Sequence, residues 1–460
     1  MHTFIFDIGK TNIKAAVLDA RGDLLWSRTT PNTAFQGVDY LQFNVDSIWD
    51  WLQESLREAA CRFVIKAINT STHGACAVLL AGDGNLAFPV MDYEFSGLQV
   101  EAEDYEALRP PFEETFSPAL AFGLNLGRQL WWLQAAFPER FQRVASILMY
   151  PQYWAWKLTG HQVTEVTSLG CHTDLWEPFN ARYSSLAEKL GLAGLFPRRV
   201  SAMEPVGNVS PALAQSLGLP LDCLVYPGVH DSNASFARHL YAGKKTLFTA
   251  ISSGTWIVSM SSRCRPDSLV ETRDMLTNVS VGNEPIGCAR FMGGREFDEI
   301  CRQALATTAS SALDIGEEDL VAVIDAGIYA IPPFQVGSGP FACKREVGRI
   351  AGGEGSPALA TLYLALMMDL ELELLGGDGS IIFGGLSRKN PLLCRLLAQL
   401  RPHQEFVACD ESAGSVTGAW CLTRWDDPVP EAMTHYEVIR PLNLPGLLAY
   451  REKWRRLSES

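Results

Sequence analysis

The stretch HTFIFDIGKTNIKAAVLD, residues 2–19, decides how the chain begins, because two apolar runs enclose Asp7 and the polar turn Gly9-Lys10-Thr11-Asn12. The turn is similar to the end of a P-loop, but that motif requires a glycine where the chain has Phe4. A P-loop also leads into a helix, whereas Ile13–Leu18 is mostly apolar and β-like. The stretch therefore predicts strand, polar turn, strand, a hairpin that could grip phosphate. An ordinary turn between buried strands is the alternative.

Length and composition predict a globular protein of two domains. The 460 residues are too many for one ordinary core, and 47% hydrophobic with 20% charged residues leaves no sign of long disorder. The net charge of −14 argues against nucleic acid as a partner, because an acidic surface repels phosphodiester backbones. The sequence has no apolar run of about 18 residues and begins directly with a strand, so we expect no membrane span and no signal peptide.

Eleven cysteines are scattered along the chain, and none forms a CxxC pair. Their spacing is not that of a zinc site. Without an export signal, reduced and mostly buried thiols are expected, which indicates the cytoplasm.

A second small-residue turn, Ser252-Ser253-Gly254-Thr255, lies between the predicted strands Thr246–Ile251 and Trp256–Met260. Two such hairpins, each leading about half of the chain, predict a duplicated architecture with a ligand between the halves and domains at 1–236 and 237–460. The turn Gly82-Asp83-Gly84-Asn85 predicts a third hairpin over residues 76–90, and apolar spacing predicts several helices. These helices are Val45–Ala60, Leu126–Ala136, Pro151–Leu158 and Ala358–Leu375. The tryptophans of the second and third of these helices are expected to pack in the core.

Asp231 follows a short apolar strand and Gly228-Val229-His230. An acid there would project from the carboxyl edge of a sheet, the usual ligand position in open α/β sheets. The same position suits a helix N-cap, and the position alone does not choose between them.

Phosphoryl transfer needs donors around the phosphates, a cation and a carboxylate that orients or deprotonates the attacking hydroxyl. The two small-residue turns could supply donors, Lys14 a positive charge, and Asp7 a ligand that holds magnesium through water. The strand Ser380–Phe383 meets Gly384-Gly385 before a predicted helix over Ser387–Leu400. A flat base or phosphate could approach the backbone at those glycines, with a tight turn as the alternative.

Taken together, these motifs resemble those of the FGGY carbohydrate kinases, which belong to the actin-like ATPase superfamily. Each motif is loose, but their order and spacing over nearly the whole chain are specific. They are Asp7–Lys14, His73-Gly74, Pro151–Gly160, Gly228–Asp231, Ser252–Trp256, Gly384–Ser387 with Asn390, and Glu411–Ala419.

The resemblance implies an α/β fold of two ribonuclease H-like domains with a central cleft. It further implies an ATP-dependent kinase of a ketose or polyol, with ATP and Mg²⁺ as cofactors and Asp231 as the general base. The first phosphate element comprises Asp7, Gly9, Lys10, Thr11, Asn12 and Lys14, the second Ser253, Gly254 and Thr255, and the adenosine element Gly384, Gly385, Ser387 and Asn390. His73 and Asp92 fall where family members contact the sugar, and His230, Ser232 and Asn233 flank the base.

Two departures from the family pattern leave the sugar and its stereochemistry open. Lys10 stands where the family usually has a small hydroxyl residue or alanine, and the usual Trp-x-Asp-x-Arg is replaced by Val90–Glu94, without the arginine. His230-Asp231 and Ser252–Trp256 are similar to rhamnulose and fuculose kinases, whereas His73 is similar to xylulose kinases.

Other functions compatible with the fold are a catalytically silent sugar or nucleotide sensor and an actin-like assembly protein. An intact Asp231 together with both phosphate turns favours the enzyme, since a sensor needs no base. His230 could tune Asp231, contact the sugar or be a packed neutral histidine. The expected partners are a small sugar and ATP, with no nucleic acid and no membrane; whether the protein is a homodimer stays open.

Overall fold

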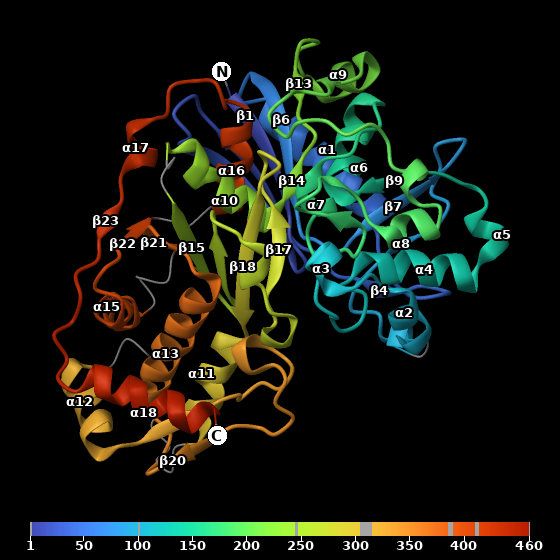
Figure 1. The fold of residues 1–460 in the computed structure, drawn as a ribbon. Helices are drawn as coiled ribbons and strands as arrows, with labels where there is room; N and C mark the ends of the chain where they lie inside the picture. The colour runs from blue at the N-terminus through green and yellow to red at the C-terminus, as the bar shows by residue number, and fades with distance from the viewer. Residues whose placement is uncertain are drawn as a thin grey trace. The chain divides into compact units, whose positions relative to one another are not determined.

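The computed structural model describes residues 2–99, 102–243, 247–303, 315–384, 390–409 and 414–459 (Figure 1). The chain divides into two compact units. Unit 1 comprises residues 1–243, 277–285 and 413–434, and unit 2 comprises 244–276, 286–412 and 435–460. The sequence predicted a single boundary after residue 236. In the structure the first change of unit follows Gly243, and the chain later returns twice to unit 1.

Unit 1 contains a mixed sheet with the strand order β12-β13-β6-β1-β2-β3, in which β14 also pairs with β6. β1 and β2 are antiparallel, so the predicted strand, turn and strand are confirmed. β6 pairs in parallel with β1 on one side and with β13 and β14 on the other. The strands are β1 (His2–Ile8), β2 (Asn12–Leu18), β3 (Leu24–Pro31), β6 (Ile65–Thr72), β12 (Gly207–Asn208), β13 (Leu224–Val225) and β14 (Val229–His230).

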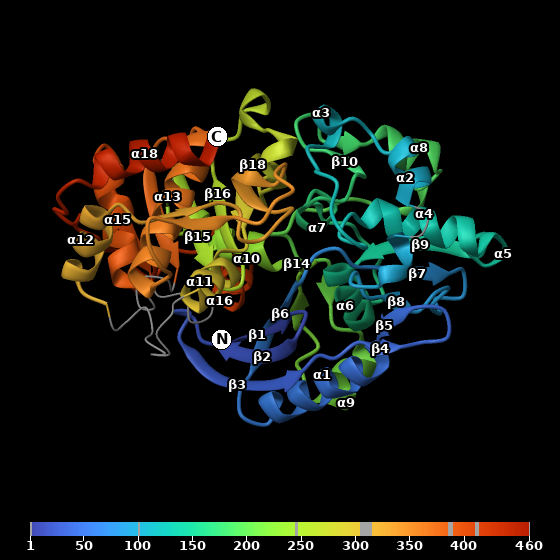
Figure 2. The ribbon, with the colours of Figure 1, turned by 90° about the horizontal axis from the view of Figure 1, so that it is seen from below.

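Both faces of this sheet are covered, which explains why β1 is apolar without alternation. Phe4 and Phe6 pack on one face with α1 (Val45–Ala60), which begins at its cap Asn44 and has the bounds that its apolar spacing predicted. Ile5 packs on the other face with Trp420. Figure 2 shows α1 and α9 (Pro211–Leu217) below the sheet, and α10 (Asp231–Tyr241) and α16 (Gly414–Leu422) above it.

The parallel register brings three strand ends to one edge of the sheet. Ile8 of β1 and His230 of β14 both align with Thr72 of β6. Adjacent strands lie about 4.8 Å apart, so the residues that follow these positions are close neighbours. We call this edge, defined by Asp7, His73 and Asp231, the carboxyl edge of unit 1.

The predicted hairpin over residues 76–90 forms only around its turn. An antiparallel bridge joins Leu80 to Leu86, and the N–H groups of Ala81 and Ala87 donate to the carbonyls of Asn85 and Leu79, each at 2.8 Å. Along its length, however, β7 (Ala77–Ala81) pairs with β9 (Val144–Met149). Pro89 has no N–H to give to a ladder, so the chain leaves β7 and forms β8 (Val90–Met91) against β5 (Leu41–Phe43).

The remaining elements of unit 1 include the predicted helices α4 (Leu126–Ala136) and α6 (Tyr150–Thr159). Trp131 and Trp154 are buried in the core, as expected. The others are β4 (Phe35–Gln36), α2 (Ala102–Leu108), α3 (Phe112–Thr115), α5 (Pro138–Phe141), α7 (Val166–Leu169), β10 (Trp176–Glu177), β11 (Arg182–Tyr183), α8 (Ser185–Lys189) and α17 (Glu431–Thr434).

Unit 2 repeats the pattern of unit 1, in the strand order β18-β16-β15-β21-β22-β23. β15 and β16 form an antiparallel hairpin, and β21 pairs with β15 in parallel, as β6 does with β1. The duplicated architecture is therefore confirmed at the level of topology. The strands are β15 (Phe248–Ser253), β16 (Ile257–Ser261), β18 (Pro285–Phe291), β21 (Ser380–Gly384), β22 (Phe406–Cys409) and β23 (Glu437–Val438).

A buried helix, α13 (Pro357–Leu375), forms the centre of the unit 2 core. Its cap Ser356 accepts a hydrogen bond from the N–H of Leu359, and Gly376 ends it in the left-handed conformation. The other elements are β17 (Leu276–Val279), which passes from unit 2 into unit 1, α11 (Gly293–Arg302), α12 (Glu317–Ala326), β19 (Tyr329–Ile331), β20 (Arg349–Ala351), α15 (Pro391–Leu400) and α18 (Leu447–Glu459).

Two global expectations can be compared with the structure. All eleven cysteines lie among the described residues, and no disulfide forms between them. Within the described part of the chain, no helix combines the length and the apolar character needed to cross a bilayer.

The contact of α10 with α16 yields a stability prediction. A Cβ atom on Gly418 of α16 would overlap the backbone oxygen of Ala234 of α10. Gly418→Ala should therefore lower the free energy of unfolding by about 1–3 kcal/mol, the range for overpacked cores, as measured by urea denaturation. Gly194→Ala is the matched control, because its Cβ would meet nothing within 4 Å. Equal stability of the two variants would contradict the prediction.

Candidate functional site

Asp231 is the first residue of α10, and the cap of that helix is His230, so the N-cap alternative for Asp231 is wrong. Its Oδ1 accepts hydrogen bonds from the backbone N–H of Ser232 at 2.6 Å and from the Ser232 hydroxyl at 3.2 Å. About a third of the side chain is exposed. Among the described residues Oδ2 has no hydrogen-bond partner. One carboxylate oxygen is thus fixed and the other is free to accept a proton.

His230 holds the fixed oxygen of Asp231. Its Nε2 lies 3.3 Å from Asp231 Oδ1, and its Nδ1 lies 2.9 Å from the side-chain oxygen of Asn233, which can only accept. Burial alone would lower the pKa of His230, but the charges of Cys171 and Asp231 outweigh burial and raise that pKa. A protonated His230 donates to both neighbours, which favours its role in tuning Asp231 over that of a neutral packing residue.

Asp7 is the second acid at the carboxyl edge of unit 1. The hydroxyl of Ser415 donates to its Oδ2 at 2.9 Å. Burial raises the pKa of Asp7 to about 6, helped by the charge of Asp231 and opposed by Ser415. Lys14 lies directly opposite Asp7 on β2 and, among the described residues, makes no hydrogen bond or ion pair. An acid and an uncommitted cation therefore stand side by side.

His73 follows β6 at the same edge and is buried. Its Nδ1 donates to the carbonyl oxygen of Gly74 at 2.9 Å, and its Nε2 has no hydrogen-bond partner within the described ranges of the chain. Burial lowers the pKa of His73, so the ring is neutral and Nε2 is an unused acceptor. A Cβ on Gly74 would lie 2.8 Å from Nε2 of His230, so the ring of His230 leaves no room for a side chain at residue 74.

In the turn Gly9–Asn12, the side chain of Lys10 does not lie with the other residues expected to bind phosphate. The N–H of Gly9 donates to the carbonyl of Asn12 at 2.9 Å, and Thr11 and Asn12 are exposed. Lys10 turns away, because its Nζ lies 2.5 Å from Asp92 Oδ2 and 3.1 Å from Glu94 Oε2. The structure thus places Lys10 beside the expected sugar residue Asp92 rather than with the phosphate turn.

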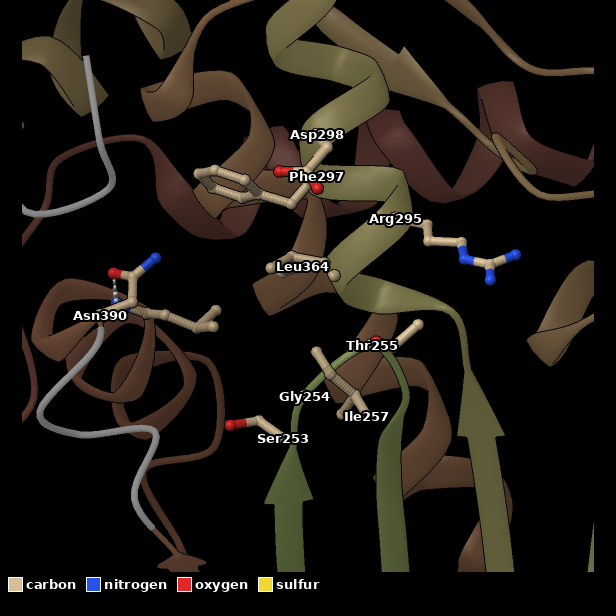
Figure 3. A pocket seen from close by; sticks show the side chains of 11 residues that line it. Ser253, Gly254, Thr255, Ile257, Arg295, Phe297, Asp298, Leu364 and Asn390 are labelled. Carbon is tan, nitrogen blue, oxygen red and sulfur yellow. Dashed lines mark hydrogen bonds between the residues drawn. The ribbon is translucent and has the colours of Figure 1, made fainter. Parts of the chain in front are cut away.

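Unit 2 contains a cavity of about 430 Å³, a size suited to a small ligand. It lies between the β15–β16 turn, the start of α11 and the start of α15 (Figure 3). The predicted residues Ser253, Gly254, Thr255 and Asn390 all line it. Its other lining residues are Ile257, Gly294, Arg295, Phe297, Asp298, Leu364 and Leu393.

The N-terminus of α11 touches the second turn. The N–H of Gly294 donates to the carbonyl of Thr255 at 3.2 Å, and a Cβ on Gly294 would lie 2.5 Å from the carbonyl oxygen of Gly254. A helix N-terminus next to a polar turn attracts anions. The sequence analysis missed Gly293-Gly294, although β18 runs through them into α11 in the same pattern that singled out Gly384-Gly385.

The wall of the cavity opposite the turn is mainly apolar. Phe297 points towards Asn390, whereas Arg295 points to the other side (Figure 3). The amide of Asn390 is already engaged, since its oxygen caps α15 by accepting from the N–H of Leu393 at 3.1 Å and its nitrogen donates to Thr361 at 3.0 Å. Asn390 therefore shapes the cavity as a helix cap. Gly384 ends β21, and Gly385 and Ser387 lie outside the described residues.

Comparisons with known proteins give the family. Residues 2–237 match the N-terminal domain of the FGGY family of carbohydrate kinases, and residues 245–431 match the C-terminal domain of carbohydrate kinase FGGY. The chain belongs to the FGGY family. A crystal structure of a carbohydrate kinase from Novosphingobium aromaticivorans is 34% identical to this FGGY protein, with a TM-score of 0.89 and 99% and 98% of the two chains covered. The two-domain α/β fold is therefore that of FGGY kinases.

Curated relatives of this FGGY protein carry the names of different sugar kinases. The L-fuculokinase of Salmonella typhi is 28% identical over 266 residues, which is 56% of this chain and 55% of the relative. The probable L-xylulose kinase of Pasteurella multocida is 29% identical over 266 residues, 55% of this chain and 54% of the relative. The chain thus spans about half the length of the curated relatives it matches.

The raised pKa of Asp7 predicts a stability effect. Ionised Asp7 lowers the free energy of unfolding by about 3 kcal/mol above pH 6, because its folded pKa exceeds the value of 3.8 for the free side chain. Asp7→Asn removes this charge and keeps an acceptor for Ser415. Urea denaturation without ligands should show it more stable by about 1–3 kcal/mol near pH 8, with a smaller gain near pH 5, where folded Asp7 is mostly protonated.

Asp19→Asn is the control for Asp7→Asn. Burial would raise the pKa of Asp19, but hydrogen bonds from the backbone of Arg21 and Asp23 outweigh it and lower that pKa. Neutralising Asp19 should therefore give no stabilisation near pH 8. An Asp7→Asn variant that is no more stable than the native chain would contradict the assigned environment of Asp7.

Proposed function

We propose that this protein is an ATP-dependent kinase that phosphorylates a primary hydroxyl of a ketose or related polyol, with Asp231 as the general base. The observation that carries the proposal is the asymmetry of the Asp231 carboxylate. Oδ1 is held by Ser232 and His230, while Oδ2 has no partner among the described residues. Membership of the FGGY family supports the same reaction class.

The free oxygen of Asp231 would accept the proton of the attacking sugar hydroxyl. The sugar oxygen then forms a bond to the γ-phosphorus of ATP while the bond to the β-phosphate oxygen breaks, which yields the sugar phosphate and ADP. The bonds to Oδ1 restrict rotation of the carboxylate, so less orientational freedom is lost on reaching the transition state. His230, whose pKa is raised by the charges of Cys171 and Asp231, would hold Oδ1 in place while the hydroxyl binds.

We assign the phosphates to two groups of residues. In unit 1 they are Gly9, Thr11, Asn12 and the uncommitted Lys14. In unit 2 they are Ser253, Gly254 and Thr255, beside the N-terminus of α11. The adenosine would occupy the unit 2 cavity, where Phe297 and Leu364 offer apolar surface to the base.

Asp7 would hold Mg²⁺ through water, and its hydrogen-bonded, poorly solvated carboxylate suits a divalent cation. Within the described residues no three histidine, cysteine or acidic side chains gather as a metal site. A single carboxylate, that of Asp7, fits Mg²⁺, because this ion takes few carboxylates and is held largely by phosphates and water. When bound, the ion neutralises charge on the phosphates.

The names of the relatives suggest the substrates to try first. L-fuculose and L-xylulose follow from L-fuculokinase and the probable L-xylulose kinase. A panel of D- and L-ketoses and polyols with ATP, followed by ADP release, tests the proposal directly. Release with one or a few sugars supports the kinase. Silence across the whole panel overturns it and leaves the sensor.

Asp231→Asn should lower kcat by about 10² or more, the range for a positioned base, because an amide cannot accept the hydroxyl proton. Its affinity for MgATP, measured by calorimetry, should stay within about twofold of the native value. Asp222→Asn is the control, since Asp222 is an exposed acid of unit 1 that pairs with Lys66. Near-native turnover in Asp231→Asn would sink the assignment of the base.

The adenosine assignment predicts a selective loss in unit 2. Phe297→Ala should weaken ATP binding by about 5- to 50-fold, as expected when a base loses an aromatic or apolar wall. Phe297→Tyr, which keeps the ring, should bind ATP almost normally. Calorimetric titration with ATP and separately with sugar checks this, because sugar affinity should not change. Normal ATP affinity in Phe297→Ala would show that the base binds elsewhere.

A further inference from the structure

The two lysines of the first hairpin have opposite environments. Lys14 stands beside Asp7 and, in the described part of the chain, has no ion pair or hydrogen bond. Lys10 pairs with two acids, at 2.5 Å from Asp92 Oδ2 and 3.1 Å from Glu94 Oε2. Two lysines four residues apart in one hairpin therefore stand in different surroundings.

The ammonium group of Lys10 is held from several directions. Its Nζ lies 5.4 Å from the ring centroids of both Phe43 and Tyr93, within the range of a cation–π contact. Burial would lower the pKa of Lys10, but its bonds to Asp92 and Glu94 outweigh burial and raise that pKa, so the group is charged. Its position is thus fixed before any ligand binds.

Lys10, and not Asp92, presents a polar group at the surface of this cluster. The Asp92 side chain is fully buried, whereas 21% of the Lys10 side chain is exposed. Both oxygens of Asp92 are in use, since Oδ2 accepts from Lys10 and Oδ1 accepts from the N–H of Glu94 at 2.9 Å. An ammonium has three N–H donors, and the two carboxylates use two of them. The third is left for a ligand.

An unused acceptor lies beside this donor. The His73 ring is 5.3 Å from the ring of Phe43 and 6.0 Å from that of Tyr93, the same two rings that flank Lys10. Its Nε2 is buried and finds no partner in the part of the chain that the structure describes, and its neutral ring can only accept there. A hydroxyl group both accepts and donates, so a polyhydroxy ligand could satisfy Lys10 and His73 together next to aromatic surface.

We propose that Lys10 is a sugar-binding residue that donates to a non-reacting hydroxyl of the substrate, with Asp92 and Glu94 as its positioning residues. The inference rests on the proposed function and names the substrate class of the same site. Two carboxylates surround one ammonium, and Asp231 adds a further negative charge at the same edge. Neutral ketoses and polyols are accepted, while sugar acids are repelled.

Calorimetry with separate ligands tests the assignment. The probes are MgATP and, of L-xylulose, L-fuculose and the remaining panel sugars, the one that gives the fastest ADP release. Lys10→Met should weaken sugar binding about 10- to 100-fold, as for a lost hydrogen bond to a charged group, with MgATP affinity within about twofold. Lys14→Met, the matched control in the same hairpin, should weaken MgATP and leave the sugar unchanged.

Folding defects are separated from binding defects by two further variants. Lys10→Met leaves the Asp92 charge buried and unpaired, whereas Lys10→Met with Asp92→Asn removes both charges. The double variant should fold stably and still bind sugar as weakly as Lys10→Met. Lys10→Arg keeps the charge and should recover part of the affinity. In steady-state assays the loss should fall on KM with little change in kcat, a split that a general loss of fold would not give.

The expected exclusion of sugar acids can be tested separately. L-xylonate, the aldonic acid of an aldose isomer of L-xylulose, should not bind the native protein, and Glu94→Gln should reduce this discrimination because it removes one negative charge. Unchanged sugar affinity in Lys10→Met, or a loss confined to MgATP, overturns the role of Lys10 while the kinase proposal stands. Failure of the native protein to bind any panel sugar overturns both proposals.

Discussion

The register of three parallel strands is the constraint on which the site of unit 1 depends. Because β1 and β14 both pair with β6, Asp7, His73 and Asp231 arrive at one edge although they are far apart in sequence. A shift of one strand by one residue would move its side chains to the opposite face and separate the two acids. The apolar residues of β1, buried on both faces, fix that register, so the hydrophobic core determines the spacing of the polar groups.

Strong local signals allowed much of this to be predicted from sequence. The helix over Val45–Ala60 shows its apolar spacing, and the hairpin around Gly9–Asn12 shows its small polar turn. Non-local pairing was the main failure, since nothing near residues 77–81 announces that their partner strand lies at 144–149. The return of residues 413–434 to unit 1 was hidden for the same reason, because that contact depends on the tertiary packing of α16.

In the candidate site, the sequence predicted where residues lie along the strands but not which partners their side chains contact. The positions of Asp7 and Asp231 could be predicted because each closes a strand. The direction of a long flexible side chain could not, and Lys10 illustrates this, since only the folded chain brings Asp92 and Glu94 to it. Asn390 shows the converse, because a residue expected to bind ligand uses its amide to cap a helix. Partner geometry decides such cases.

The packing of α10 on α16 has a mechanical consequence. α10 begins with Asp231, and the first turn of α16 carries Ser415, which holds Asp7. These helices meet at Gly418, where there is no room for even a methyl group. A tilt of the pair would therefore displace Asp231 together with the Ser415 hydroxyl that donates to Asp7. A ligand that moves Asp231 would also disturb the hydrogen bond to Asp7, so the positions of the two acids are coupled through this helix contact.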